Sequence, residues 1–335
     1  QNPVTFEDVH FNGNVLTLGS ASTHLKLIDP LFLDGTTLET GAGSLTLAGA
    51  MKLQNGAELN SSGGTITLES DNSDFFVESG SLFSIPDTAL VTNNYLSFFG
   101  STLKTKNTTF TTEDSYGISF GKGSILEVEG IQNITGLSLD DSSTLRLAAD
   151  TELENDNWMS VGTLDLADFA LTLGDTMSKL TVTEPVTLDA ATEQIISGDA
   201  DLSLNGGITV SNGTLSSTEG TLSASSFSIG AAGTVNILGG TLSLPAGGTA
   251  VSGAAFTTSD ATISLEGTLE VADSWTITNT SISLTGEASL SHSSTVPLSL
   301  ASLQTNGHDF ELASATTDLT IENAFALSGG ETLST

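Results

Sequence analysis

Apolar and polar residues alternate along this chain in short triplets, in which two apolar residues flank a small or polar one. Examples lie far apart in the sequence: Leu16-Thr17-Leu18, Leu45-Thr46-Leu47, Leu171-Thr172-Leu173 and Leu242-Ser243-Leu244. Alternation with a period of two places the apolar side chains on one face of an extended chain, so each triplet predicts a β-strand. No stretch repeats at helical spacing in the same way, and we expect an all-β protein.

The triplets recur at a regular distance, which predicts how the strands are arranged. Successive triplets begin at Leu202, Ile208, Leu215 and Leu222, and three such steps span about 20–22 residues. A repeat of that length is typical of solenoids, in which each coil carries three short strands and each strand lies beside its equivalent one coil later. The prediction is a right-handed parallel β-helix, with the hand taken from the general preference of parallel crossovers.

We expect one continuous β-helix to account for residues 1–335 without a second domain. Between triplets stand pairs such as Asn55-Gly56 and Asn306-Gly307, which tolerate the left-handed backbone angles that tight corners require. Strand-like residues stand close to both ends, and solenoids normally need caps. We therefore expect a segment of a longer chain, end-to-end stacking of copies, or a small cap within the first dozen residues.

Residues 75–122 form an irregular segment of this repeat, because aromatic residues cluster there. Aromatic rings beside cations can stack on sugars or on a partner surface. The residues that we propose for such a ligand or partner face are Tyr95, Phe98, Phe99, Lys104, Lys106 and Tyr116. The alternative is that wider coils in this region use larger side chains to fill the core.

Charge narrows the set of partners. Seven Lys and Arg stand against 40 Asp and Glu, the formal net charge is −33, and no Lys or Arg follows Lys179. Such a chain is a poor match for phosphates or for an anionic membrane surface, and no apolar run approaches the roughly 20 residues of a membrane span. We expect no nucleic-acid binding and no membrane insertion; the expected partners are further copies of the chain, or cell-surface and glycan receptors.

Two acidic stretches are candidates for calcium, which takes oxygen ligands from carboxylates and carbonyls. The first holds Glu69, Asp71 and Asp74, and the second holds Glu154 and Asp156. Neither has the spacing of an EF-hand or of a calcium-binding nonapeptide repeat, so solvated turns are the alternative and we expect no required cofactor. The chain contains no cysteine, which excludes disulfides and thiolate metal sites.

Many parallel β-helices are polysaccharide lyases or hydrolases, and such enzymes depend on recognisable catalytic groups. A lyase needs a cation or a basic side chain to stabilise its anionic intermediate, and a base to remove a proton. Arg146 stands at the centre of an apolar triplet and is expected to face solvent, while Asp140-Asp141 lacks the Gly-His-Gly and Arg-Ile-Lys elements of polygalacturonases. We predict no catalytic residues and no enzyme; a polysaccharide-binding or polysaccharide-degrading β-helix is the alternative.

Threonine pairs suggest one further alternative, an ice-binding β-solenoid. The pairs Thr65/Thr67, Thr181/Thr183 and Thr276/Thr278 would point outward from strands. An ice-binding face needs such pairs at multiples of one repeat on a single face, and these pairs do not recur coil after coil.

The segment Gly41-Ala42-Gly43-Ser44-Leu45-Thr46-Leu47-Ala48-Gly49 resembles the strand repeat of bacterial autotransporter passengers and other large secreted β-helical adhesins. Gly240-Thr241-Leu242-Ser243-Leu244 and Leu303-Gln304-Thr305-Asn306-Gly307 look similar. The resemblance implies an extracellular location on a bacterial cell surface and a structural or adhesive role. Stacking of end coils would then assemble the module into fibres.

Overall fold

The computed structural model is all-β, as predicted, and every regular element in its described part is a strand. The chain divides into two compact units, unit 1 (Gln1–Ala167) and unit 2 (Asp168–Thr335). Each unit is a parallel β-solenoid, and the two hold about 13 turns together. A single continuous β-helix over residues 1–335 stays a prediction. The structure describes residues 3–6, 16–17, 20, 22–69, 75–112, 117–133, 137–154, 158–246, 249–251, 255–271, 275–292, 297–313, 318–328 and 331–334.

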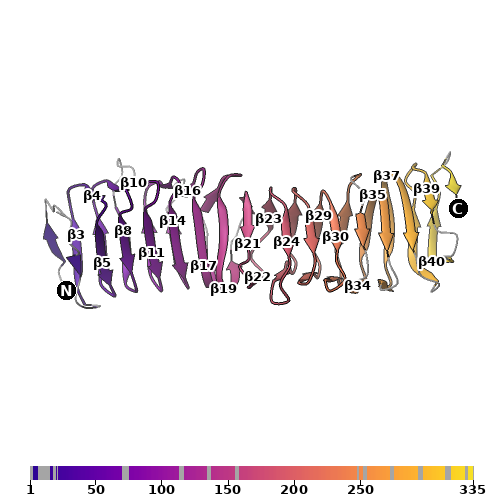
Figure 1. Ribbon diagram of the computed structural model, residues 1–335, viewed down its shortest axis with the longest axis horizontal. Helices are drawn as coiled ribbons and strands as arrows, with labels where there is room; N and C mark the ends of the chain where they lie inside the picture. The colour runs from indigo at the N-terminus through magenta and orange to yellow at the C-terminus, as the bar shows by residue number, and fades with distance from the viewer. Residues whose placement is uncertain are drawn as a thin grey trace. The chain divides into compact units, whose positions relative to one another are not determined.

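Unit 1 is built from three columns of parallel strands, and its coils follow one another along the unit (Figure 1). A coil contributes one short strand to each column, except where one long strand runs through two columns. The first column contains β2 (Leu16–Thr17), β5 (Thr37–Gly41), β8 (Glu58–Ser61), β11 (Leu82–Pro86), β14 (Thr102–Lys106), β17 (Ile125–Asn133), β19 (Thr144–Glu154) and β21 (Thr163–Asp165). The second contains β1 (Val4–Phe6), β3 (His24–Leu27), β6 (Ser44–Leu47), β9 (Thr65–Leu68), β12 (Ala89–Thr92), β15 (Thr109–Thr112) and the later halves of β17 and β19. The third contains β4 (Leu31–Asp34), β7 (Met51–Gln54), β10 (Phe75–Val77), β13 (Leu96–Phe98), β16 (Ile118–Phe120) and β18 (Leu137–Leu139), with β20 (Trp158–Val161) in contact with β18.

Unit 2 repeats the same three-column plan. Its first column contains β22 (Ala170–Leu173), β25 (Gln194–Ile196), β28 (Thr214–Ser217), β31 (Thr234–Ile237), β34 (Ala255–Ser259), β36 (Trp275–Thr278) and the early halves of β38 (Leu298–Gln304) and β40 (Leu319–Ala326). The second contains β23 (Lys179–Val182), β26 (Asp201–Leu204), β29 (Thr221–Ala224), β32 (Thr241–Leu244), the early halves of β35 (Thr262–Val271) and β37 (Ser281–His292), and the later halves of β38 and β40. The third contains β24 (Val186–Leu188), β27 (Ile208–Val210), β30 (Phe227–Ile229), β33 (Thr249–Val251), the later halves of β35 and β37, β39 (Phe310–Leu312) and β41 (Leu333–Ser334).

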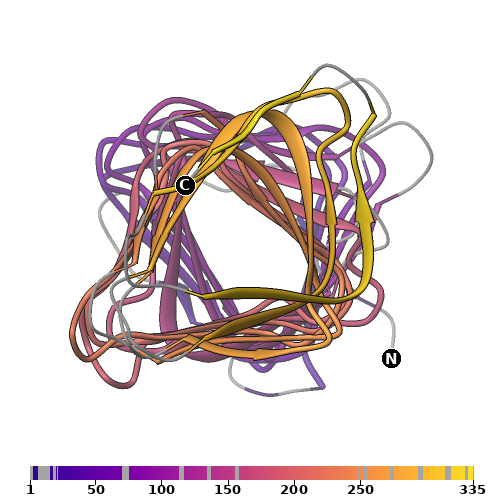
Figure 2. The same ribbon diagram turned by 90° about the vertical axis from the view of Figure 1, so that its right-hand side faces the viewer.

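The inward residues of each column lie directly opposite their equivalents in the next coil. In the second column of unit 1, Leu25 pairs with Leu45, Leu45 with Ile66, and Ile66 with Leu90. These steps lie near the predicted repeat of about 20–22 residues. All four side chains are buried, and burying one Leu or Ile is worth roughly 1.5–3 kcal/mol. Seen end-on, the orange and yellow coils of unit 2 wind around a common axis (Figure 2). The inward side chains of these coils are likewise buried.

The aromatic-rich stretch 75–122 turns out to follow the same strand pattern as its neighbours. Several of its aromatic residues are buried core fillers: Phe75, Phe83, Phe98, Phe110 and Phe120. The rings of Phe98 and Phe120 are nearly parallel, with centroids 4.7 Å apart. Large side chains therefore stack along the inside of unit 1, which supports the core-filling interpretation for most of this stretch.

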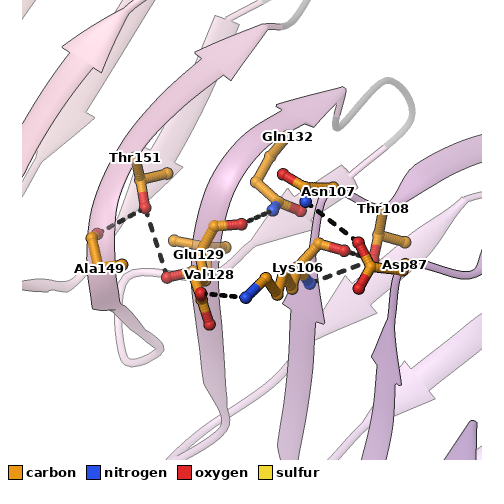
Figure 3. Close-up of polar contacts among 9 residues, drawn as sticks. All are labelled: Asp87, Lys106, Asn107, Thr108, Val128, Glu129, Gln132, Ala149 and Thr151. Carbon is orange, nitrogen blue, oxygen red and sulfur yellow. Dashed lines mark hydrogen bonds and ion pairs between the residues drawn. The ribbon is translucent and has the colours of Figure 1, made fainter. Parts of the chain in front are cut away.

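The corner between the first and second columns of unit 1 is held by stacked polar side chains (Figure 3). On its inner side the buried Thr108 hydroxyl donates to the Ile85 carbonyl at 2.7 Å. On its outer side Asp87 and Asn107 both adopt left-handed backbone angles, and Asn107 Nδ2 donates to Asp87 Oδ1 at 3.1 Å. The corner thus satisfies its own backbone groups and ties one coil to the next.

Gly41 and Gly49, at the two ends of the Gly41–Gly49 segment, are each required for a different physical reason. Gly41 ends β5 with a left-handed φ of 55°, which costs glycine little. A Cβ on Gly49 would lie 2.6 Å from the Asp29 carbonyl carbon of the preceding coil. The spacing of these glycines therefore reflects the geometry of a tight, closely stacked coil.

Candidate functional site

The residues predicted for a ligand face do not share one surface. Tyr95 and Phe99 flank β13 in the third column, whereas Lys104 and Lys106 belong to β14 in the first column. Consecutive strands of a coil belong to different columns, so the aromatic and cationic residues are directed to different sides of unit 1. Tyr116 lies outside the described residues.

Phe98 was wrongly placed on that face. Its side chain has no exposed surface, and its ring stacks between those of Phe83 and Phe120, with centroid distances of 6.3 and 4.7 Å. Because residues alternate between the two faces of a strand, Phe98 points inward and its neighbour Phe99 remains outside. Phe98 is a core residue and cannot contact a ligand from solvent.

Lys104 and Lys106 bind carboxylates of the next coil. Lys104 Nζ lies 2.9 Å from Glu127 Oε1, and Lys106 Nζ lies 2.5 Å from Glu129 Oε1 (Figure 3). The hydrogen bond and the charge of Glu129 raise the pKa of Lys106 above its usual value of 10.5. Both lysines therefore act as cross-coil ties on the first column.

An exposed group of aromatic rings remains on the third column of unit 1. We call Phe32, Phe76, Tyr95 and Phe99 the aromatic patch. Phe32, Tyr95 and Phe99 are 61%, 50% and 49% exposed, and the rings of Phe76 and Phe99 have centroids 6.2 Å apart. Sequence reasoning missed Phe32, although its place at the centre of Leu31-Phe32-Leu33 predicts an outward side chain.

The two calcium candidates are only partly described. Glu69 Oε2 lies 2.6 Å from Lys26 Nζ, so this carboxylate is held by an ion pair across coils. Glu154 is half-buried at the end of β19, whereas Asp71, Asp74 and Asp156 lie outside the described residues. Among the residues that are described, no group of three or more His, Cys, Asp or Glu side chains could hold a metal ion. Calcium binding stays a prediction.

The groups considered for catalysis make local contacts. Arg146 faces outward as expected, and its Nε donates to Asp165 Oδ2 at 2.8 Å. Asp140 Oδ1 accepts hydrogen bonds from the backbone N–H and the hydroxyl of Ser142, at 2.8 and 2.6 Å, within one turn. Asp141 Oδ1 accepts a weaker one from Ser160 Oγ at 3.3 Å. Asp140 therefore stabilises a turn, whereas Arg146 and Asp141 form contacts between adjacent coils.

Hydroxyl pairs do recur coil after coil in unit 2, contrary to the expectation from Thr-x-Thr pairs alone. We call the outward residues of β29, β32, β35 and β37 in its second column the hydroxyl rows. Their members are the pairs Thr221/Ser223, Thr241/Ser243, Thr262/Ser264 and Ser281/Ser283. The sequence search missed them because it required threonine at both positions, whereas the second position here is serine.

The geometry of the hydroxyl rows follows from strand pairing. Neighbouring coils place equivalent residues about 4.8 Å apart, and alternate residues along a strand lie about 6.6 Å apart. All eight side chains are half-buried. Ser223 Oγ donates to Ser203 Oγ at 3.1 Å, so the second row continues one coil further. The result is a two-dimensional lattice of hydroxyl groups on one side of unit 2.

In comparisons with known proteins, no family model matches the chain, and no curated protein or solved structure matches it. The resemblance to autotransporter passengers and secreted adhesins therefore stays a prediction from the Gly41–Gly49 segment and its relatives within the chain. Within the described residues, no helix is long and apolar enough to cross a membrane.

Proposed function

We propose that the chain is an extracellular structural or adhesive module of a bacterial cell surface. The observation that carries this proposal is that many outward side chains form hydrogen bonds with side chains of the adjacent coil. Asn55 bonds Asp34, Asn60 bonds Glu39, and Asn279 bonds Asp260, each one repeat away. A surface organised in this way favours a stiff scaffold with a polar exterior. The location is supported by the resemblance of the strand repeat to secreted adhesins.

Immunolabelling of intact cells that produce the protein tests the location. Antibodies against the purified chain should label unbroken cells, and external protease should remove the label. Labelling that requires lysis would contradict the proposal. Adhesion is tested by binding of chain-coated beads to surfaces or cells, with beads coated with an unrelated acidic protein as the control for net charge.

Self-association is part of this proposal. Phe325, Leu327 and Leu333 on and beside β40 and β41 are all more than 40% exposed, and pairing with another coil is the way this fold covers such side chains. Light scattering should show growth of assemblies with concentration, reduced in Phe325→Glu. A monomer at every concentration would exclude assembly while leaving the surface role untouched.

A second candidate function is recognition of ice, favoured by the hydroxyl rows of unit 2. A regular lattice of hydroxyl groups can engage an ordered array of water molecules, and the row spacing is fixed by the strands. The purified chain should then inhibit ice recrystallisation, and Thr241→Lys should abolish the effect. Thr209→Lys, on the third column of the same unit, is the matched control. Ordinary ice growth with the unaltered chain would dismiss this candidate.

A further inference from the structure

The aromatic patch of unit 1 is centred on Phe76. In the register of the third column, Lys52 lies opposite Phe76 in the preceding coil and Ser97 lies opposite it in the following coil. Tyr95 and Phe99 stand on either side of Ser97, four residues apart, which separates their Cα atoms by about 13 Å. Phe32 lies opposite Lys52 one coil earlier. The rings therefore spread over several adjacent coils on one side of the unit.

Glycines stand opposite Tyr95 and Phe99 in the next coil, and the second of them makes room for the Phe99 ring. Gly117 follows Tyr95 in the column, and its carbonyl accepts the N–H of Leu96 at 3.1 Å. A Cβ on Gly121 would lie 3.1 Å from Cδ1 and 3.3 Å from Cε1 of Phe99. No left-handed backbone angle accounts for Gly121. The close approach of the Phe99 ring explains the glycine there, and the ring leans along the surface of the column.

Polar groups surround the rings at short range. Lys52 Nζ and Glu78 Oε1 form an ion pair at 3.0 Å, and both side chains are more than a third exposed. Ser97 Oγ and Ser119 Oγ are 3.0 Å apart in the next two coils. The surface thus offers aromatic faces beside donors and acceptors of hydrogen bonds. This combination suits a ligand with apolar C–H faces and hydroxyl edges.

We propose that the aromatic patch binds a neutral polysaccharide by stacking sugar rings on Phe76, Tyr95 and Phe99. The net charge of −33 opposes acidic polysaccharides and nucleic acids. A second copy is a poor occupant, because three half-exposed rings and the less exposed Phe76 offer less than about 400 Å², and a stable interface needs about 800 Å² per partner. The patch can bind a glycan whether or not the chain is a surface module.

Binding assays with the full chain test this assignment. The probes are cellulose, chitin, xylan and a soluble β-1,3-glucan, with alginate as an acidic polymer and phosphatidylcholine vesicles as a lipid surface. At least one neutral glycan should bind, with little dependence on salt. The double variant Phe76→Ser/Phe99→Ser should weaken that binding about tenfold or more. Leu238→Ser, at an exposed apolar residue of unit 2 that belongs to neither proposed surface, should bind like the unaltered chain.

Several results would overturn the assignment: no binding of any neutral glycan, equal binding by the double variant, or patch-dependent binding of alginate or vesicles instead. Patch-dependent dimerisation in light scattering would also overturn it. The variants are compared with the parent by circular dichroism and thermal melting. If the double variant fails to fold, the single variants Tyr95→Ser and Phe99→Ser replace it, and each must then weaken glycan binding.

Discussion

Phe98 and Phe99 are neighbours in the chain with opposite surroundings. Phe98 is fully buried in an aromatic stack, whereas Phe99 is about half exposed beside Gly121. The difference follows from strand geometry, because consecutive side chains point to opposite faces. At the scale of the single residue, one position therefore supports the core and the next is available for binding.

Replacement of these two residues should have very different effects on stability. Phe98→Ala leaves a cavity and should lower the free energy of unfolding of unit 1 by about 3–5 kcal/mol. Phe99→Ala removes exposed surface and should change it by less than about 1 kcal/mol. Urea unfolding followed by far-ultraviolet circular dichroism measures both. Equal losses in the two variants would show that the strand register at β13 is wrong.

Asp260 gives unit 2 a pH-dependent contact. Asn279 Nδ2 donates to its carboxylate at 2.7 Å and Ser259 Oγ donates at 3.1 Å, and these bonds lower its pKa below 3.8. A lowered folded-state pKa stabilises the fold above the unfolded pKa, and that contribution is lost as pH falls below about 4.

The variant Asn279→Asp should turn this attractive contact into a repulsive one. The new carboxylate faces Asp260 without a donor, while aspartate still tolerates the left-handed angle of 45° at this position. The variant should melt at a lower temperature than the parent at neutral pH, and the difference should shrink below pH of about 4, where carboxylates become protonated. Asn236→Asp adds the same charge between Ser216 and Thr257 and serves as the control. An Asn279→Asp deficit independent of pH would contradict the assignment.

At the scale of the element, the corners depend on buried hydroxyl groups. Thr108 in unit 1 is almost completely buried and donates to the Ile85 carbonyl of the preceding coil. Thr108→Val keeps the shape but removes the donor, so we expect a loss of about 1–2 kcal/mol in the free energy of unfolding. The neighbouring exposed Thr109 provides the matched variant Thr109→Val, which should change it by less than about 0.5 kcal/mol. Equal effects of the two substitutions would contradict a stabilising role of the Thr108 hydrogen bond in the corner.

The outward side chains of the first column form a line of alternating charge in unit 1. Glu127 lies opposite both Lys104 and Arg146, and Arg146 lies opposite Asp165. Partly exposed ion pairs are worth little, so a double-mutant cycle on Lys104 and Glu127 should give a coupling of about 0.2–1 kcal/mol. The coupling should decrease in high salt. A value that does not respond to salt would contradict a direct charge interaction.

At the scale of the whole molecule, much of the architecture was predictable because one physical pattern repeats. Alternation at Leu96-Ser97-Phe98 predicts strand β13 and an inward Phe98, although aromatic clustering had suggested a shared outer face. The corners vary in length, so the number of residues per coil is not constant. Which residues lie opposite each other in successive coils therefore cannot be read from the sequence. Cross-coil contacts such as Lys104 with Glu127 therefore required the structure. The hydroxyl rows were within reach of the sequence, had serine been counted with threonine.

Both units are stabilised in the same way. Apolar side chains stack inside each unit, and polar side chains on the outside form contacts between coils. In unit 1 the described outward surface also carries ion pairs and the aromatic patch, whereas unit 2 carries the hydroxyl rows. After Lys179 the chain has no Lys or Arg, so most of unit 2 depends on hydrogen bonds between coils and not on ion pairs with these residues. Each of the proposed surfaces exists only if equivalent residues of successive coils are direct neighbours.

Disulfide formation in engineered pairs tests this coil register most directly, because the chain has no cysteine of its own. Ser223 and Ser243 lie directly opposite each other in adjacent coils, where Cα atoms are about 4.8 Å apart and a disulfide can close. The account predicts that Ser223→Cys/Ser243→Cys loses its free thiols on oxidation, while Ser223→Cys/Ser264→Cys, two coils apart, keeps them. A disulfide in the second pair and none in the first would contradict the parallel stack of coils.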